Sequence, residues 1–181
     1  MSVTNFPGKI LYQLASLFVF VTSACAAQSD PDSLGVTLCA ADEDIYFSCP
    51  LPGDKIVSIC ASNNTNPISG YVQYRYGTAD QIEMYYPDKK APPNNRFSLV
   101  DASEGSVNKN IIKFKNGQYT YLLSQAFVSY LTVLRGEKVV LRRTCNEGGY
   151  AFISRKAEQG TIPLRKAMKT FVERYVLASA S

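Results

Sequence analysis

The most telling absence in this chain is histidine, because none of its 181 residues is one. Histidine is the commonest general base, proton shuttle and metal ligand in proteins. Without it, Ser-His-Asp and Cys-His catalysis and the usual zinc-hydrolase ligand sets are excluded. The sequence also lacks the GxGxxG, P-loop and GxSxG motifs. We therefore expect no enzymatic activity, no catalytic residue, no metal site and no cofactor.

Long runs of like charge are also missing. The chain has 19 Lys and Arg against 15 Asp and Glu, a net charge of +4, which does not favour nucleic-acid binding. The densest acidic run, Asp42-Glu43-Asp44, lacks the alternating oxygen ligands and central glycine of a calcium loop, so we expect a solvated turn. Tryptophan is absent, whereas 12 Tyr and 9 Phe favour a β-rich protein.

The N-terminal segment has the layout of a secretory signal peptide. Lys9 precedes the apolar stretch Ile10–Val21, and small residues follow it. This stretch is short for a membrane-spanning helix. We expect residues 1–27 to be a signal peptide, residues 28–34 a flexible lead and residues 35–181 a single domain. An alternative stays open, in which Thr22-Ser23-Ala24-Cys25 resembles a bacterial lipobox and lipidated Cys25 tethers the protein to a membrane.

Four cysteines follow the export segment. An even set in an exported chain predicts two disulfides and an oxidising compartment. A turn sequence at residues 50–54 predicts a hairpin in which Cys49 lies near the turn and Cys60 near the open end. These two cysteines are then farther apart than the ~7 Å between Cα atoms that a disulfide allows. We favour the pairs Cys39–Cys60 and Cys49–Cys145, with free buried thiols as the alternative.

Short runs of β-forming residues alternate with turn residues along the rest of the chain. The Asn116-Gly117 pair is a strong hairpin indicator, and residues 87–95 are too rich in proline for a central strand. The predicted strands are Val36–Cys39, Ile45–Cys49, Lys55–Cys60, Tyr71–Tyr76, Ile82–Tyr86, Asn110–Lys115, Gln118–Leu123, Phe127–Leu134, Val139–Arg143 and Tyr150–Ser154.

The C-terminal tail has helical periodicity. Pro163 suits a first helical turn, and Leu164, Met168, Phe171 and Tyr175 recur at helical spacing, which predicts a helix over residues 163–177. The expected fold is mainly β. It is an antiparallel meander that closes as a barrel or packs as a sandwich, with this one C-terminal α-helix against it.

Tyr and Arg are the residues most favoured at protein interfaces, and they are densest along the predicted strand at residues 71–76. An alternative is that half of these rings are ordinary core residues of the sheet. The candidate partner-binding residues are Ser69, Tyr71, Gln73, Tyr74, Arg75 and Tyr76.

Two resemblances concern the same region. The runs DIYFSC, GDKIVSIC and SGYVQYRYG between Asp44 and Gly77 resemble a group of small uncharacterised exported proteins of Gram-negative bacteria. Residues 69–74 (SGYVQY) are similar to the SGxxY loop motif of the periplasmic lysozyme inhibitors, with Gln73 at the position of the motif tyrosine and Tyr74 one residue later. The second likeness implies a small disulfide-bonded β protein that inhibits a cell-wall hydrolase.

These observations favour an exported protein-binding domain, periplasmic or secreted, or anchored to the outer membrane through Cys25. Its partner would be another protein in the envelope or outside the cell, and its role that of an inhibitor or immunity protein against a cell-wall hydrolase or toxin. The main alternative is a structural envelope protein or lipoprotein with no enzymatic target. A third class is an enzyme that acts through carboxylates or tyrosines, and a carboxylate pair roughly 5–10 Å apart in a deep cleft would favour it.

Overall fold

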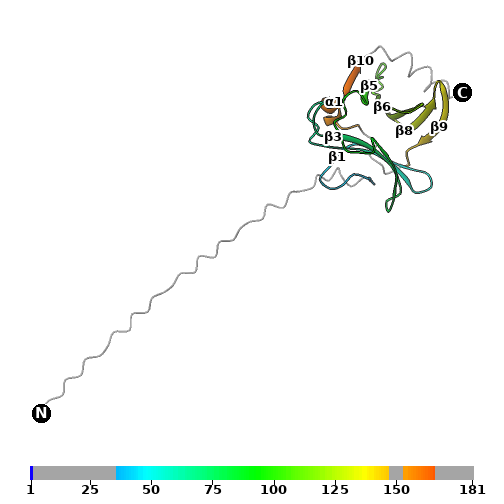
Figure 1. Ribbon diagram of the computed structural model, residues 1–181. Coiled ribbons are helices and arrows are strands. Elements are labelled where there is room, and N and C mark those ends of the chain that lie inside the picture. Colours follow the sequence, from blue (N-terminus) through cyan, green and yellow to red (C-terminus); the bar gives the residue numbers. More distant parts are fainter. Residues whose placement is uncertain (2–35, 147–152, 166–181) are drawn as a thin grey trace. The chain divides into compact units, whose positions relative to one another are not determined.

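The computed structural model describes Met1, residues 36–146 and residues 153–165 (Figure 1). The chain divides into two compact units, Met1–Asp30 and Pro31–Ser181, and all the described residues except Met1 belong to the second. The predicted signal peptide beyond Met1, the flexible lead and Cys25 lie outside the described residues. Within the described ranges, no helix is long and apolar enough to cross a membrane.

The first sheet has four antiparallel strands in chain order: β1 (Asp44–Leu51), β2 (Lys55–Ser62), β3 (Tyr71–Gly77) and β4 (Ile82–Tyr86). Leu51 pairs with Lys55, so the predicted first hairpin closes over three residues, Pro52 to Asp54. Gly53 and Asp54 both have positive φ there, a conformation that glycine and aspartate tolerate in turns.

The second sheet has six strands in the order β10-β5-β6-β7-β8-β9. They are β5 (Phe97–Asp101), β6 (Asn110–Asn116), β7 (Tyr119–Gln125), β8 (Tyr130–Arg135), β9 (Lys138–Thr144) and β10 (Ile162–Arg165). Strands β5 to β9 are antiparallel, and β10 adds to the β5 edge in parallel. Asn116 pairs with Tyr119, so the predicted hairpin forms, but its two-residue turn is Gly117-Gln118, one residue later than the expected Asn116-Gly117, and Gly117 has a φ of 57°.

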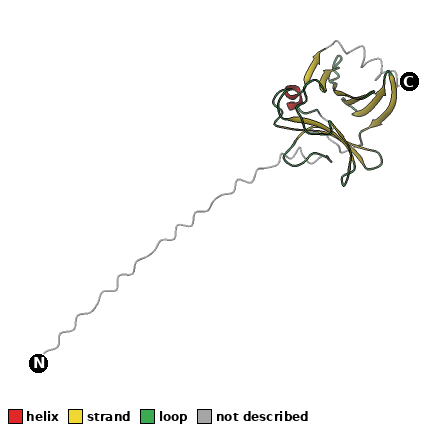
Figure 2. Ribbon diagram, viewed as in Figure 1, coloured by secondary structure: helices red, strands yellow, loops and turns green. Residues whose placement is uncertain are grey.

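The main core lies between the two sheets, which remain open and pack as a sandwich (Figure 2). The mainly β, antiparallel fold expected from the sequence is thereby confirmed. Burial of each large core side chain contributes about 1.5–3 kcal/mol. The first sheet contributes Tyr46, Phe47, Val57, Ile59 and Tyr74, and the second contributes Phe97, Ile112, Phe114, Leu123 and Leu131.

The second sheet also has a separate cluster of buried apolar residues. Val100, Ile111, Leu122 and Leu134 occupy the face opposite the main core, because successive side chains of a strand point to opposite faces. This sheet therefore buries apolar residues on both of its faces.

Both disulfides join the cysteines in the pairing favoured from the sequence. Cys39 is bonded to Cys60 of β2, and Cys49 of β1 to Cys145, each with 5.3 Å between the Cα atoms. In the hairpin Cys49 pairs with Val57, three residues away from Cys60. Since Cys145 directly follows β9, the second bond connects the two sheets. The two disulfides are compatible with an oxidising compartment.

The predicted strand at Val36–Cys39 is wrong. This segment has no ladder pairing, and serine side chains hold it instead: Ser48 Oγ donates to the Val36 carbonyl (2.8 Å), and the Leu38 N–H donates to Ser58 Oγ (3.0 Å). The apolar alternation suggested a strand, but hydroxyl groups on β1 and β2 satisfy its backbone.

The C-terminal elements are also placed differently. The described helix is α1 (Lys156–Gly160), and residues 162–165 form β10, so a helix beginning at Pro163 is wrong. A proline is tolerated in an edge strand such as β10, because its missing N–H need not donate to a ladder. Ile153 and Ser154 belong to no strand, whereas 150–152 and 166–177 lie outside the described residues.

Candidate functional site

The β2–β3 loop, residues 63–70, presents an apolar side chain to solvent. Ile68 is 76% exposed, although the residues around it are polar. Single exposed apolar side chains are common on protein surfaces, so Ile68 is considered together with the contacts that hold its loop. These contacts hold the backbone of the loop in place.

Asn64 is the buried anchor of the loop. Its Nδ2 donates to the carbonyls of Asn66 (2.8 Å) and Ser69 (2.9 Å), and its Oδ1 accepts a hydrogen bond from the Tyr46 hydroxyl (2.8 Å). Burial, followed by the nearby charge of Asp44, raises the pKa of Tyr46 to about 12, so this hydroxyl keeps its donor proton. The core of the sandwich thus supports the loop from beneath.

A second set of hydrogen bonds closes the loop from within. Ser69 Oγ accepts from the N–H groups of Thr65 and Asn66, each at 3.2 Å. Asn66 Oδ1 accepts from the N–H of Ile68 (2.9 Å), directly at the exposed residue. The loop polar groups are therefore satisfied locally, as Asx and Ser/Thr turns allow.

Two glycines permit close approaches that any larger residue would block. Gly70 has a φ of 57°, and a Cβ there would lie 2.1 Å from the Ser62 carbonyl oxygen. A Cβ on Gly160, at the end of α1, would lie 1.7 Å from Asn64 Oδ1 and 2.4 Å from the Tyr46 hydroxyl. The helix therefore packs directly on the anchor of the loop.

The β4–β5 loop, residues 87–96, lies against the β2–β3 loop. The Asn94 N–H donates to the Pro67 carbonyl (2.7 Å) and ties the two loops together. Lys90 Nζ donates to the Tyr71 hydroxyl (2.9 Å) and lies 4.6 Å from the centre of that ring. We name the two loops together, with Tyr71, the loop surface.

A buried ion pair lies next to the loop surface. Arg75 donates to both carboxylate oxygens of Glu43, each at 2.6 Å, and its Nη1 also donates to the Leu38 carbonyl (2.8 Å). The Glu43 side chain has no exposed area, and Tyr71 and Lys90 also donate to it. A bidentate arginine–carboxylate pair is among the stronger and more directional contacts in proteins.

The charge of Glu43 is stabilised by these donors. Burial by itself raises the pKa of the carboxyl, but hydrogen bonds from Arg75, Tyr71, the Ala40 N–H and Lys90 lower it to about 2. The expected solvated turn at residues 42–44 is therefore wrong for its central residue. The acidic run indicated exposure, yet one of its three carboxylates is a buried partner of Arg75.

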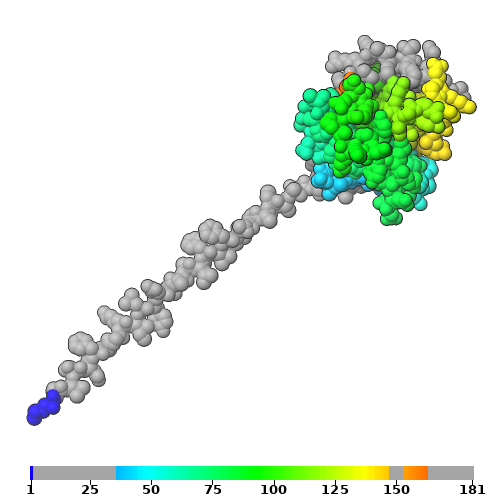
Figure 3. Space-filling model, in the orientation of Figure 1, coloured from blue at the N-terminus to red at the C-terminus, as the bar shows by residue number. Residues whose placement is uncertain are grey.

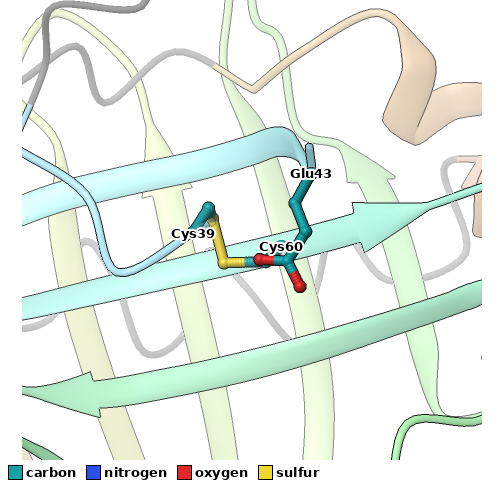
Figure 4. Close-up of side chains that lie close together, drawn as sticks. All are labelled: Cys39, Glu43 and Cys60. Carbon is teal, nitrogen blue, oxygen red and sulfur yellow. A yellow bond between two sulfur atoms is a disulfide. The ribbon is translucent and has the colours of Figure 1, made fainter. Parts of the chain in front are cut away.

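Glu43 also lies beside the Cys39–Cys60 disulfide (Figure 4). The two sulfurs and a carboxylate oxygen lie within 4.8 Å of one another, a spacing that suits a metal ion. In the oxidised protein, however, the sulfurs are bonded to each other, and the carboxylate is paired with Arg75. These three residues therefore form a structural contact under the loop surface.

The structure separates the six candidate partner-binding residues into two groups. Ser69 and Tyr71 belong to the loop surface, and Tyr76 is partly exposed. The others, Gln73, Tyr74 and Arg75, are each no more than 5% exposed and offer almost no side-chain surface to a partner. Gln73 donates to the Pro87 carbonyl (2.9 Å) and Tyr74 lies in the core, so the interpretation of half these rings as core residues holds for Tyr74.

Sequence reasoning missed Ile68, the most exposed apolar residue of the loop surface. The sequence did contain an indication of this site, because Ile68 is the single large apolar residue in the Asn- and Ser-rich run of residues 62–69.

A small apolar pocket of about 270 Å³ opens between the sheets, away from the loop surface. The space-filling view shows a face on which green segments adjoin the yellow β8–β9 hairpin (Figure 3). The pocket is lined by Tyr74, Tyr76, Met84, Tyr119, Tyr121, Leu131, Val133 and Leu141. The exposed part of Tyr76 therefore faces this pocket and is separate from the loop surface.

Comparisons of the chain with protein-family models, with curated proteins and with solved structures found no match. The site must therefore be judged from its own geometry.

Proposed function

We propose that the chain is an exported protein-binding domain that recognises its partner through the loop surface. The observation that carries the proposal is Ile68, exposed at the tip of a loop whose polar groups are internally hydrogen-bonded. A loop held in one conformation loses little entropy on binding, which is the usual advantage of a preorganised binder. An apolar anchor of this kind suits insertion into a pocket of the partner.

The charges beside Ile68 suggest what the partner looks like. The β4–β5 loop carries the exposed charges of Lys89, Arg96 and Asp88, whereas Lys90 is already paired with Glu43, so a small excess of positive charge lies near the apolar tip. A complementary cleft is apolar at its centre and acidic at its rim. Glycoside hydrolases have this character, since two carboxylates flank the scissile bond in their active sites. We therefore propose a periplasmic or secreted inhibitor, or an immunity protein, directed against a cell-wall hydrolase.

Two further observations support this proposal without deciding it. The two disulfides favour an oxidising compartment outside the cytoplasm. The loop also contains Ser69 and Gly70, which begin the motif that resembles the lysozyme inhibitors. In the proposed role Ser69 acts by bracing the loop, because its Oγ accepts two backbone hydrogen bonds there.

The test is binding to purified cell-wall glycosidases and to proteins captured from envelope extract. We expect nanomolar to micromolar binding to at least one hydrolase, with slower clearing of a cell-wall suspension. Ile68→Asp should weaken this binding about 30-fold or more, as loss of an interface hot spot does.

Phe127→Asp is the matched control, because Phe127 is also a fully exposed apolar residue but lies in the β7–β8 connection. It should leave the affinity within about twofold of the wild type. Equal binding by wild type and Ile68→Asp would overturn the loop as the site. Failure to bind any envelope protein would favour the structural envelope protein instead.

A further inference from the structure

The small apolar pocket between the sheets is a break in the close packing of the main core. Protein interiors have few voids larger than a water molecule, whereas this pocket has a volume of about 270 Å³. All the described residues that line it belong to the main core or pack against it, so both sheets point side chains into one space. The pocket is open to solvent through its partly exposed members, which are Tyr76, Met84, Tyr119, Tyr121 and Leu141.

The pocket forms where a row of rings on the second sheet gives way to smaller side chains. Phe97, Phe114 and Tyr121 are successive cross-strand neighbours, and the centres of the stacked Phe114 and Tyr121 rings are 4.7 Å apart. The same row continues with Val133 on β8 and Leu141 on β9. These aliphatic side chains are smaller than the rings before them, so the space between the sheets is not filled there.

The lining of the pocket is aromatic and uncharged. It contains four tyrosines and also Met84, whose sulfur makes favourable contacts with rings. Within the described part of the chain no Asp, Glu, Lys or Arg lines the pocket, so a charged ligand would be buried there without a partner. An aromatic ligand gains ring contacts in this pocket that an aliphatic ligand of the same size does not.

The tyrosine hydroxyls supply the hydrogen-bonding groups of the pocket. The Tyr121 hydroxyl donates to Met84 Sδ (3.9 Å), which is a weak acceptor that a ligand oxygen would replace. Burial, followed by repulsion from Tyr121 and Tyr76, raises the pKa of Tyr74. Burial, followed by repulsion from Tyr119, raises the pKa of Tyr121. The hydroxyls of Tyr74 and Tyr121 therefore keep their protons and can donate to a ligand.

We infer that this pocket binds a small uncharged aromatic molecule of one or two rings that carries a hydroxyl or carbonyl oxygen. An engineered cavity of about 150 Å³ in another protein holds benzene. The volume of about 270 Å³ therefore gives room for a substituted ring and little more. The ligand ring would continue the row of rings over Val133 and Leu141, and its oxygen would accept a hydrogen bond from Tyr121.

This site does not depend on the proposed function. Ile68 and the other residues of the loop surface do not line the pocket. Hydrolase binding and the binding of an aromatic molecule can therefore fail separately.

The experiment is an NMR titration of the whole mature protein with p-cresol, a single ring with one hydroxyl group. We expect saturable shifts of the amides at residues 74–76, 119–121 and 131–133, with a dissociation constant of about 1 mM or tighter. The saturated analogue 4-methylcyclohexanol has the same size but no aromatic ring, and it should bind about threefold more weakly or worse. Benzoate brings a charge that would be buried, and it should bind about tenfold more weakly or worse.

Variants of the lining test whether the ligand lies in this pocket. A ring at residue 133 extends the row of rings and fills the space, so Val133→Phe should weaken p-cresol binding about tenfold or more. Tyr121→Phe keeps the ring and removes the donor, and it should weaken binding about threefold.

Val140→Phe is the matched control, because Val140 of β9 is 48% exposed and lies outside the pocket. It should change the affinity by less than about twofold. If Val133→Phe does not fold, Leu141→Phe at a partly exposed position of the pocket decides the question in the same way. Absence of saturable shifts, or equal weakening by Val140→Phe, would overturn the inference.

Two further probes represent other occupants of an apolar pocket. Heptanol has as many heavy atoms as p-cresol, and its tighter binding would indicate a site for aliphatic chains. N-acetyltyrosinamide joins the same ring to a peptide backbone, and its tighter binding would indicate a site for a tyrosine side chain of a protein partner. Either result would contradict a small aromatic ligand, whereas weaker binding of both probes than of p-cresol would support it.

Discussion

The two sheets of the sandwich are stabilised in different ways. The first sheet buries a network of polar groups, in which Glu43 pairs with Arg75 and the hydroxyls of Ser48 and Ser58 lie 2.9 Å apart. The second sheet relies on apolar residues, since it packs against the main core on one face and forms a second cluster on the other. The proposed recognition loop extends from the polar sheet, where directional bonds fix its position.

This difference has a physical reason. Apolar packing is non-directional and tolerates small shifts, whereas hydrogen bonds and ion pairs specify one arrangement. A loop that must present Ile68 in one position benefits from the second kind of contact. The second sheet has only to remain a stable support, and two-residue turns join β6 to β7 and β8 to β9.

The largest expected effect comes from removing the buried cation of the first sheet. Arg75→Met leaves the Glu43 carboxylate buried beside an apolar side chain, and it should lower the free energy of unfolding by about 3 kcal/mol or more. Urea unfolding followed by tyrosine fluorescence measures this, since the chain has 12 Tyr and no Trp. Arg143→Met, at an exposed position of β9, should change stability by no more than about 0.5 kcal/mol. Equal effects of the two variants would contradict the comparison.

A smaller effect is expected from pH. The pKa of Glu43 is about 2 in the folded protein and lies below its ordinary value of 4.5. The unfolded chain therefore takes up the proton first, so this stabilisation is complete above pH 4.5 and is lost as pH falls through about 2. Urea midpoints between about pH 6 and pH 3 should fall less steeply in Glu43→Gln than in the wild type. If the urea midpoint depended on pH equally in both proteins, the protonation of Glu43 would not be coupled to unfolding.

The smallest effects contrast two buried serines. Ser48 Oγ donates to the Val36 carbonyl and lies 2.9 Å from Ser58 Oγ, so Ser48→Ala should cost about 1 kcal/mol. Ser124 Oγ of the second sheet is buried and has no hydrogen-bond partner among the described contacts. Ser124→Ala should therefore be neutral or stabilising, by up to about 1 kcal/mol. Thermal unfolding of both variants tests this pair. A loss of stability in Ser124→Ala would indicate that the Ser124 hydroxyl has a hydrogen-bond partner.

The hairpins and the exclusion of a Cys49–Cys60 bond were predictable because their causes are local. Gly53 and Gly117 mark turns that fix the strands beside them, and strand alternation places Cys49 and Cys60 too far apart to bond. Excluding the Cys49–Cys60 bond left two of the three possible pairings, and the structure has the one that we favoured. Local rules of this kind operate over a few residues and are visible in the sequence.

The elements that sequence reasoning missed depend on distant partners. Strand β5 was not predicted, and β10 pairs with it only after about sixty intervening residues. The burial of Glu43 depends on Arg75, and nothing in the acidic run itself indicates a cation 32 residues later. The fold was therefore more predictable than the site, since the site is made of long-range contacts.

The close approach of Gly160 to Asn64 means that the proposed recognition loop would not keep its conformation if it were removed from this fold. Its anchor is completed by a helix nearly one hundred residues downstream, where even one added methyl group would collide with the amide. A synthetic peptide that copies residues 62–71 would lack both the helix and the Tyr46 hydroxyl. Transferring the proposed binding to another scaffold would therefore require Tyr46 and the end of α1 as well as the loop itself.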